Sequence, residues 1–501
     1  MPIPAGPIFP EPTLTLIEGA LRPPRMQIRN IAIIAHVDHG KTTLVDALLA
    51  QSGTFRANQQ VAERAMDSNE LERERGITIL AKCTSLVWNN VRINIVDTPG
   101  HADFGGEVER ILSMVDGVVV LVDSAEGVLP QTKFVTGKAL RLGLNPIVVI
   151  NKIDRSDSRP DEVLNEIFDL FVALEANETQ LDFPVLYASG RSGWADEERD
   201  GPQKDLGPLF DLVVRHVPEP TVELDQPFKM LVTTLESDAF LGRVLTGRIL
   251  SGSITPNVTV KTLTRDGKEV EQARITKLLA FRGLERIAQD RADAGDIVAI
   301  TGFKSASVAD TLCDPKVTEP IAAEPIDPPT LAMTFSVNNS PLAGREGSKV
   351  TSRMIRARLA QEAEGNVAIQ VSETDSADSF EVAGRGELQL GVLIETMRRE
   401  GFEVAISRPR VLYSTDPKTG QRLEPIEEVI IDVDEEHSGT VVEKMAERKG
   451  EMQNMAPFGA GRQRLVFHAP SRGLIGYHGE FLTDTRGTGV MNRLFLEYGP
   501  Y

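Results

Sequence analysis

The most informative polar residues of this chain form an Asn-Lys-x-Asp motif, made by Asn151, Lys152 and Asp154 with Ile153 at the variable position. The motif follows an apolar run, 146–150, that is typical of a buried parallel strand, and open α/β sheets bind ligands at the carboxyl ends of such strands. A carboxylate at Asp154 can accept hydrogen bonds from both N1–H and the 2-amino group of guanine, whereas adenine has no such donor pair. The motif therefore predicts guanine recognition.

An upstream segment has the composition of a phosphate-binding loop, lying between the strand-like run 30–34 and the helix-like run 41–49. Backbone N–H groups of such a turn, with the positive end of the helix, surround the β-phosphate. The first glycine of the usual pattern is replaced by Ala35, whose small side chain keeps the turn feasible. We expect Lys41 to reach the β- and γ-phosphates and the Thr42 hydroxyl to ligate Mg²⁺. The residues predicted to bind the phosphates are Asp38, His39, Gly40, Lys41, Thr42 and Thr43.

A third motif, Asp-Thr-Pro-Gly-His at 97–101, ends the strand pattern 91–96. Asp97 in that position is predicted to hold Mg²⁺ through water, and Gly100 to turn its N–H toward a γ-phosphate. His101 would then lie next to the attacking water. A lone histidine is more often a surface or core residue, but its place directly after Asp-x-x-Gly favours the catalytic role.

The segment 73–79 lies between the two phosphate motifs. By itself it is a charged helix end stopped by Gly76 and followed by a strand. Its position favours another interpretation, in which Thr78 is a second hydroxyl ligand of Mg²⁺ on a loop ordered only by GTP.

Together with Ser189 and Gly190, these motifs resemble the five nucleotide motifs of the translational GTPases, the elongation-factor class. In that class the fifth motif touches the guanine O6 through its backbone. The run 105–110, the later run 472–476 and a GTPase domain without a large insertion resemble the BipA/TypA family of ribosome-associated GTPases. The resemblance extends from about Met26 to the C-terminus.

The resemblance implies a GTPase that binds GTP, GDP and Mg²⁺ and is stimulated by ribosomes, in translation or ribosome assembly under stress or low temperature. It implies contacts with the sarcin-ricin loop of the large subunit, with the small subunit, with rRNA and with tRNA, by a cytoplasmic monomer. Two alternatives remain, an assembly scaffold with weak GTPase activity and a P-loop ATPase with an unrelated task. Asn151 and Asp154 argue against the ATPase, and Thr78 with His101 argues against the scaffold.

The composition agrees with this interpretation in part. A chain of 501 residues with 41% hydrophobic content can form three or four domains. Two cysteines cannot build a disulfide framework, which fits a reducing cytosol, and no apolar stretch approaches the length of a membrane span. The formal net charge of −19 opposes RNA binding, so ribosome contact would depend on local basic patches.

The chain is predicted to be multidomain, with α/β and β parts. A Pro-rich and disordered N-terminal extension is expected before Met26, the expected natural start. The barrel is predicted from five β-type runs, and the last module from strand 427–433, helix 439–449 and strand 462–468. The expected order is an extension (1–25), a P-loop GTPase domain with a doubly wound, mostly parallel sheet (26–220), a β-barrel (221–325), and two ferredoxin-like α+β domains (326–407 and 408–501) similar to domains III and V of elongation factor G.

Two further expectations concern RNA binding. The family continues into a final C-terminal domain that this chain is expected to lack, as a truncated form, because it stops at Tyr501. Five arginines could form forked hydrogen bonds with RNA phosphates or could simply cover a solvated face. These are Arg353, Arg356, Arg358, Arg385 and Arg472.

Overall fold

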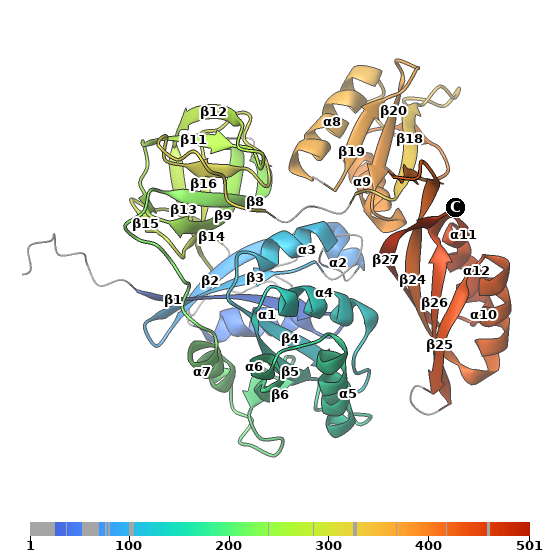
Figure 1. Ribbon diagram of the computed structural model, residues 1–501, viewed down its shortest axis with the longest axis horizontal. Helices are drawn as coiled ribbons and strands as arrows, with labels where there is room; N and C mark the ends of the chain where they lie inside the picture. Colours follow the sequence, from blue (N-terminus) through green and yellow to red (C-terminus); the bar gives the residue numbers. More distant parts are fainter. Residues whose placement is uncertain are drawn as a thin grey trace, which may run out of the picture.

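The protein is described from a computed structural model in which four modules follow one another along the chain (Figure 1). The expected extension, 1–25, lies outside the described residues. No helix within the described ranges is long and apolar enough to cross a membrane. The structure describes residues 26–501 except 37, 53–69, 76–77, 79–80, 100–104, 239, 284, 324–327, 367, 417 and 458–460.

The first module, here called the G domain, is built on a seven-stranded sheet with the order β2-β3-β1-β4-β5-β6-β7. The five central strands are parallel, and β2 and β7 are antiparallel at the two edges. Continuous apolar runs form the central strands because both faces of the sheet are covered. The strands are β1 (Gln27–Ala35), β2 (Lys82–Trp88), β3 (Val91–Asp97), β4 (Gly117–Asp123), β5 (Asn145–Asn151), β6 (Val185–Ser189) and β7 (Trp194–Asp196).

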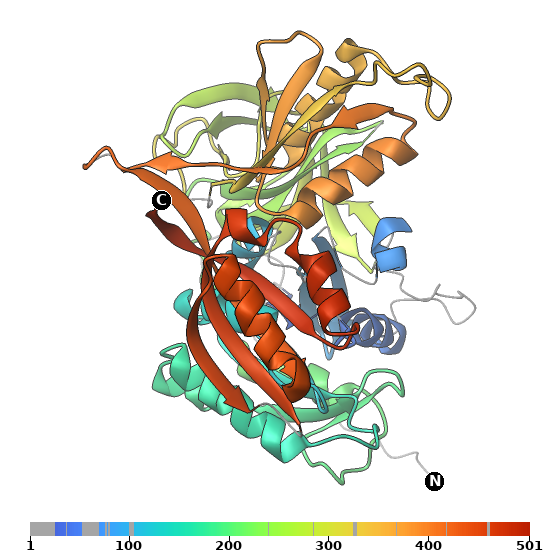
Figure 2. The ribbon, with the colours of Figure 1, turned by 90° about the vertical axis from the view of Figure 1, so that its right-hand side faces the viewer.

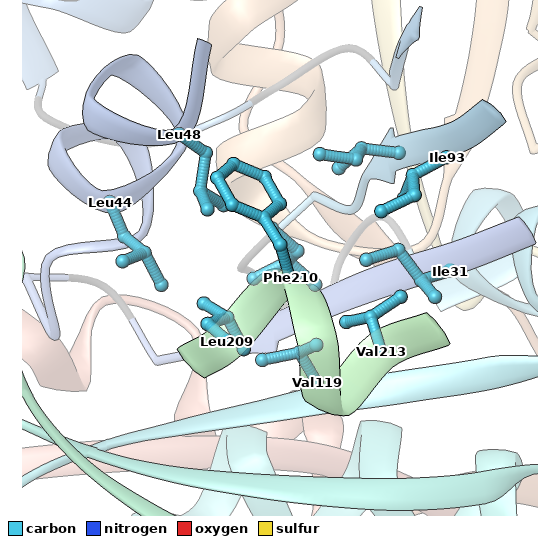
Figure 3. Close-up of a pocket in the computed structure, with 10 residues that line it drawn as sticks. Ile31, Leu44, Leu48, Ile93, Val119, Leu209, Phe210 and Val213 are labelled. Carbon is cyan, nitrogen blue, oxygen red and sulfur yellow. The ribbon is translucent and has the colours of Figure 1, made fainter. Parts of the chain in front are cut away.

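Helices cover both faces of this sheet and bury two apolar cores. One core lies between the sheet, α1 and α7, where Leu44 and Leu48 face Phe210 around a small apolar pocket (Figure 3). Close packing there holds α1, the helix that follows the predicted phosphate loop, against the sheet. The helices are α1 (Lys41–Gln51), α2 (Glu70–Arg75), α3 (Gly105–Leu112), α4 (Pro130–Arg141), α5 (Pro160–Ala173), α6 (Glu178–Leu181) and α7 (Gly207–His216).

The second module is a barrel-like antiparallel sheet of eight strands with the order β12-β11-β17-β8-β9-β16-β13-β14. The sequence did not predict the edge strand β12, because its polar residues carry no clear hydrophobic alternation. The strands are β8 (Lys229–Asp238), β9 (Gly242–Ser251), β10 (Ser253–Ile254), β11 (Thr259–Leu263), β12 (Glu269–Arg274), β13 (Lys277–Arg282), β14 (Glu285–Ala288), β15 (Ala292–Asp293), β16 (Ile297–Thr301) and β17 (Thr311–Cys313), with β10 and β15 in a separate pair.

Both remaining modules are antiparallel sheets backed by helices, each with its own core. The third contains β18 (Leu331–Val337), α8 (Ser352–Gly365), β19 (Gln370–Glu373), β20 (Ser379–Gly384), α9 (Glu387–Arg399), β21 (Val404–Ile406) and β22 (Arg410–Val411). The fourth contains β23 (Ser414–Thr415), β24 (Arg422–Asp434), α10 (Glu435–Glu447), β25 (Glu451–Pro457), β26 (Arg462–Pro470), α11 (Ser471–Leu474), α12 (Tyr477–Asp484) and β27 (Val490–Pro500).

The fold class predicted from the sequence is confirmed by these four modules. Two predicted boundaries in the fourth module are wrong, since the strand expected from residue 427 begins at Arg422 and the helix expected from residue 439 begins at Glu435. Glu435 and Glu436 lie in its first turn, where carboxylates interact favourably with the helix dipole, and Gly439 is accommodated inside the helix.

A set of paired polar side chains, here called the polar seam, joins the G domain to the barrel. It consists of Asn30, Arg92, Asn94 and Asp296. Arg92 lies 2.8 Å from Asp296, while the amide of Asn94 donates to Asn30 Oδ1 at 2.8 Å. Asn30 in turn donates to the carbonyl of Gly295 at 3.0 Å. Because these groups are buried or nearly so and bind one another, the seam holds the barrel against the sheet.

The fourth module rests on the G domain beside α4 (Figure 2). Arg464 donates to the carbonyl of Val128 at 3.5 Å, and Lys133 of α4 lies 3.8 Å from Glu428 of β24. The modules thus surround the G domain on two sides, the barrel at β2 and β3 and the fourth module at α4.

Candidate nucleotide site

The G domain brings the predicted motifs to one edge of its sheet. Ile33 of β1 is in register with Asp97 at the end of β3, and Asp123 at the end of β4 is in register with Asn151 at the end of β5. The polar residues at the C-terminal ends of these parallel strands therefore lie at the same edge of the sheet, which is the usual ligand edge of an open α/β sheet.

The loop after β1 has a backbone shape that its glycine makes possible. Gly40 has a φ of 92° and is the N-cap of α1. A Cβ atom there would lie 2.5 Å from Asn151 Nδ2, so both conformation and space require glycine. Asp38 also has a positive φ, of 65°. Thr42 and Thr43 follow in the first turn of α1, partly and largely exposed.

Asn151 links the phosphate loop to the fifth motif. Its Nδ2 donates to the carbonyl of His39 at 2.8 Å, and its Oδ1 accepts from the backbone N–H of Gly190 at 2.9 Å. The side chain is almost completely buried. The sequence predicts that Asn151 belongs to the guanine site, and the structure shows that its amide joins the loop after β1 to the loop after β6.

Lys41 and Asp97 form a buried ion pair, with Lys41 Nζ 2.7 Å from Asp97 Oδ1. Lys41 Nζ also donates to the carbonyl of Thr98, and the Thr98 hydroxyl donates to the carbonyl of Ile33 at 2.7 Å. The cation predicted for the phosphates and the carboxylate predicted for the metal thus lie side by side. Burial makes their attraction stronger than it would be in water.

Asp123, a buried carboxylate at the same edge, belongs to none of the motifs predicted from the sequence. It lies 2.7 Å from Lys152 Nζ and 3.2 Å from Arg155, and it accepts from the N–H of Ala125 at 2.7 Å. Burial alone would raise the pKa of Asp123, but the hydrogen bonds from Lys152 and Ala125 outweigh it and hold that pKa below its ordinary value. The signal was available, because Asp123 ends an apolar strand as Asn151 does.

His39 directs its side chain into the protein. Its ring is fully buried, its Nδ1 accepts from the backbone N–H of Asp123 at 3.3 Å, and its Nε2 lies 3.5 Å from Glu126. The hydrogen bond with His39 lowers the pKa of Glu126 despite partial burial. Any contact of His39 with phosphate would therefore come from its backbone.

The remaining predicted residues differ in their surroundings. Asp154 is exposed and makes no hydrogen bond or ion pair with the residues that the structure describes, so its carboxylate is available to a ligand. Ser189 is buried, and its hydroxyl accepts from the N–H of Ser192 at 3.2 Å. Thr78 is only 5% exposed. Gly100 and His101 lie outside the described residues.

Three family models match the chain. The elongation factor Tu GTP-binding domain matches 26–219, elongation factor Tu domain 2 matches 242–313, and the elongation factor G C-terminus matches 421–501. Proteins called large ribosomal subunit assembly factor BipA are 54% identical in Escherichia coli K12 and 52% in Bacillus subtilis 168, over 94% and 95% of this chain and 77% of each relative. The chain belongs to the BipA family of translational GTPases. It is accordingly a GTPase, and its G domain binds guanine nucleotide.

The comparisons correct one expectation from the sequence. The match of residues 421–501 to the elongation factor G C-terminus shows that a C-terminal domain is present, so the statement that one is lacking was wrong in that form. The fold extends to distant proteins as well. A crystal structure of a protein from Thermus thermophilus has a TM-score of 0.65 and 18% identity, over 95% of this chain and 98% of that one.

Two of the arginines considered for RNA binding are engaged within the protein. Arg358 lies 2.7 Å from Glu400 and 2.8 Å from Glu362, and Arg472 lies 2.6 Å from Glu424. Binding of phosphate by these two side chains would have to compete with carboxylates already in place.

Proposed function

We propose that this GTPase works on the ribosome, in assembly of the large subunit, and that ribosomes stimulate its GTP hydrolysis. The observation that carries the proposal is the 52–55% identity to BipA assembly factors over at least 94% of the chain, through all four modules. A relationship confined to the G domain would support nucleotide chemistry alone.

The site residues take the following proposed roles. Asp154 binds the guanine base, supported by its exposed carboxylate, and the backbone at Ser189 and Gly190 closes the base site. The loop around Gly40 surrounds the β-phosphate through its N–H groups. When nucleotide binds, Lys41 leaves Asp97 and neutralises the β- and γ-phosphates.

Mg²⁺ fits the donors that the chain offers. Asp97, through water, and the hydroxyls of Thr42 and Thr78 are oxygen donors of the kind Mg²⁺ prefers. No cluster of three or more His, Cys, Asp or Glu side chains able to hold a metal occurs in the described part of the chain. That agrees with an ion held mainly by hydroxyls and nucleotide phosphates. When bound, Mg²⁺ would neutralise charge on the phosphates.

We assign the catalytic role to His101 and the sensing of the γ-phosphate to Gly100, from their places after Asp97. A histidine there would orient the attacking water once an outside surface directs it inward. The sarcin-ricin loop of the large-subunit RNA is the proposed surface. Hydrolysis is then slow in the free protein and fast on ribosomes.

The proposed partners are the two ribosomal subunits, their rRNA and tRNA, met by a monomer in the cytoplasm. The barrel, 221–325, would face the small subunit, and the ferredoxin-like modules, 326–407 and 408–501, would lie toward rRNA. With a net charge of −19, the protein as a whole repels RNA, so binding should rely on a few local contacts and weaken steeply with salt.

Ribosome co-sedimentation with GTP or GDP, combined with turnover measurements, tests the proposal. We expect ribosomes to raise GTP turnover, and His101→Ala to lower the stimulated rate by roughly 10²-fold while GTP affinity stays the same. Stimulation that survives unchanged in this variant would remove His101 from the mechanism. Ribosome binding without any stimulated turnover would instead favour the scaffold.

A further inference from the structure

The short helix α2 is held by ion pairs on two sides. Within the G domain, Glu72 is fully buried and lies 2.6 Å from Nζ of Lys82, the first residue of β2. From outside the G domain, Arg399 at the end of α9 lies 2.5 Å from Glu74. Figure 1 shows α9 of the third module next to α2. A residue of the third module is therefore bound directly to the G domain.

This helix lies next to the nucleotide edge of the sheet. Lys82 is directly opposite Asp97 in the antiparallel ladder between β2 and β3, so the two backbones are about 5 Å apart. Asp97 in turn is paired with Lys41. A succession of charged groups thus runs from Arg399 to the residues proposed for phosphate and metal.

The chain continues from α2 to Thr78 within four residues of Glu74. Thr78 is 5% exposed, so its side chain is turned into the protein. Four residues of extended chain span at most about 14 Å, so the position of Glu74 limits where Thr78 can lie. Holding α2 in place therefore limits the positions that Thr78 can take.

A second ion pair, within α9, holds the Arg399 side chain in position for this contact. Arg399 also lies 2.9 Å from Glu395, one turn earlier in α9, which orients the guanidinium toward α2. The hydrogen bond from Arg399 keeps the pKa of Glu74 below its ordinary value. The neighbouring Arg398 differs, because it donates two hydrogen bonds to Glu395 within its own helix.

We propose that Arg399 is a positioning residue for the GTPase reaction, which holds α2 through Glu74 and so favours the inward position of Thr78 at the nucleotide. The proposal rests on the proposed role of Thr78 as a Mg²⁺ ligand. Since that role needs a γ-phosphate beside the metal, the Arg399–Glu74 pair should favour GTP over GDP. The third module then contributes to the choice of nucleotide without touching it.

The test measures affinities of the full-length chain for GDP and for a non-hydrolysable GTP analogue, with Mg²⁺ and without ribosomes. We expect Arg399→Ala and Glu74→Ala each to weaken analogue binding about two- to fivefold, the scale of an exposed ion pair, with GDP affinity unchanged. The double variant should be no weaker than either single one. Raising the salt should shrink the difference between wild type and variants. Arg398→Ala is the matched control and should bind both nucleotides as wild type does.

The two single variants change residues in different modules, so a folding defect in one module cannot explain the same result in both variants. Equal loss for GDP and the analogue, additive effects in the double variant, or no effect at all would overturn the positioning role. If wild type itself bound neither nucleotide, the proposed function would fail as well. Normal wild-type binding with unaffected variants would remove the inference alone.

Discussion

Replacing Asn151 by alanine should weaken the binding of GDP and XDP by the same factor. The substitution removes two buried hydrogen bonds, to the carbonyl of His39 at 2.8 Å and from the N–H of Gly190 at 2.9 Å. Each bond contributes about 1–1.5 kcal/mol, and each loss leaves a buried backbone group without a partner. The sum is roughly 2–3 kcal/mol, which corresponds to about 30- to 150-fold in affinity if the loops must be rebuilt on binding.

The contrast with Asp154 makes this prediction specific. Asp154 is exposed and has no hydrogen-bond or ion-pair partner in the described part of the chain, so Asp154→Asn should leave the loops intact and alter only base recognition. We expect that variant to lose guanine affinity by roughly 2–3 kcal/mol and to gain tolerance for xanthine. Asn151→Ala should keep the wild-type ratio of GDP to XDP affinity.

Calorimetric titration of GDP, XDP and ADP into both variants provides the measurement. Asn177→Ala is a suitable control, because Asn177 accepts a hydrogen bond from the N–H of Gln180 as the N-cap of α6, away from the ligand loops. It should lower the melting temperature slightly without changing nucleotide affinity. A change of the GDP to XDP ratio in Asn151→Ala as large as in Asp154→Asn would refute the bracing role.

Three further predictions concern the loop, acid stability and the domain interface. Gly40→Ala should abolish nucleotide binding in the same titrations, because a Cβ atom at φ 92° would lie 2.5 Å from Asn151 Nδ2. The pKa of Asp123 is lower in the folded protein than its ordinary value near 4, so the ionised side chain stabilises the fold fully above about pH 4, and this stabilisation is lost as the pH falls further. The melting temperature of Asp123→Asn should therefore depend less on pH below about 4 than that of the wild type. Arg92→Ala should lower the free energy of unfolding by about 2–3 kcal/mol because Asp296 loses its ion-pair partner, and adding Asp296→Ala should recover part of the loss.

Sequence reasoning located the nucleotide motifs because each follows an apolar strand whose end the pattern marks. It placed Asn151 and Asp154 together in a base site, yet nothing in a linear motif shows that the Asn151 amide reaches across to His39. Asp123 was not predicted as a site residue because it belongs to no extended motif. The sequence could not predict ion pairs between modules, such as the pair of Arg399 with Glu74, which are 325 residues apart. Hydrophobic periodicity indicates which face of an element is buried, and it does not indicate which distant charged residue that element contacts.

The polar seam limits how the G domain and the barrel could be exchanged between proteins. A foreign barrel would have to supply a carboxylate for Arg92 and an acceptor for the Asn30 amide at the same places. Without them, a charge and an amide would be enclosed with no partner, at a cost comparable to much of a domain's net stability. Chimeras of this protein should therefore be cut after the barrel, keeping residues 26–325 together, and not between the G domain and the barrel near residue 220.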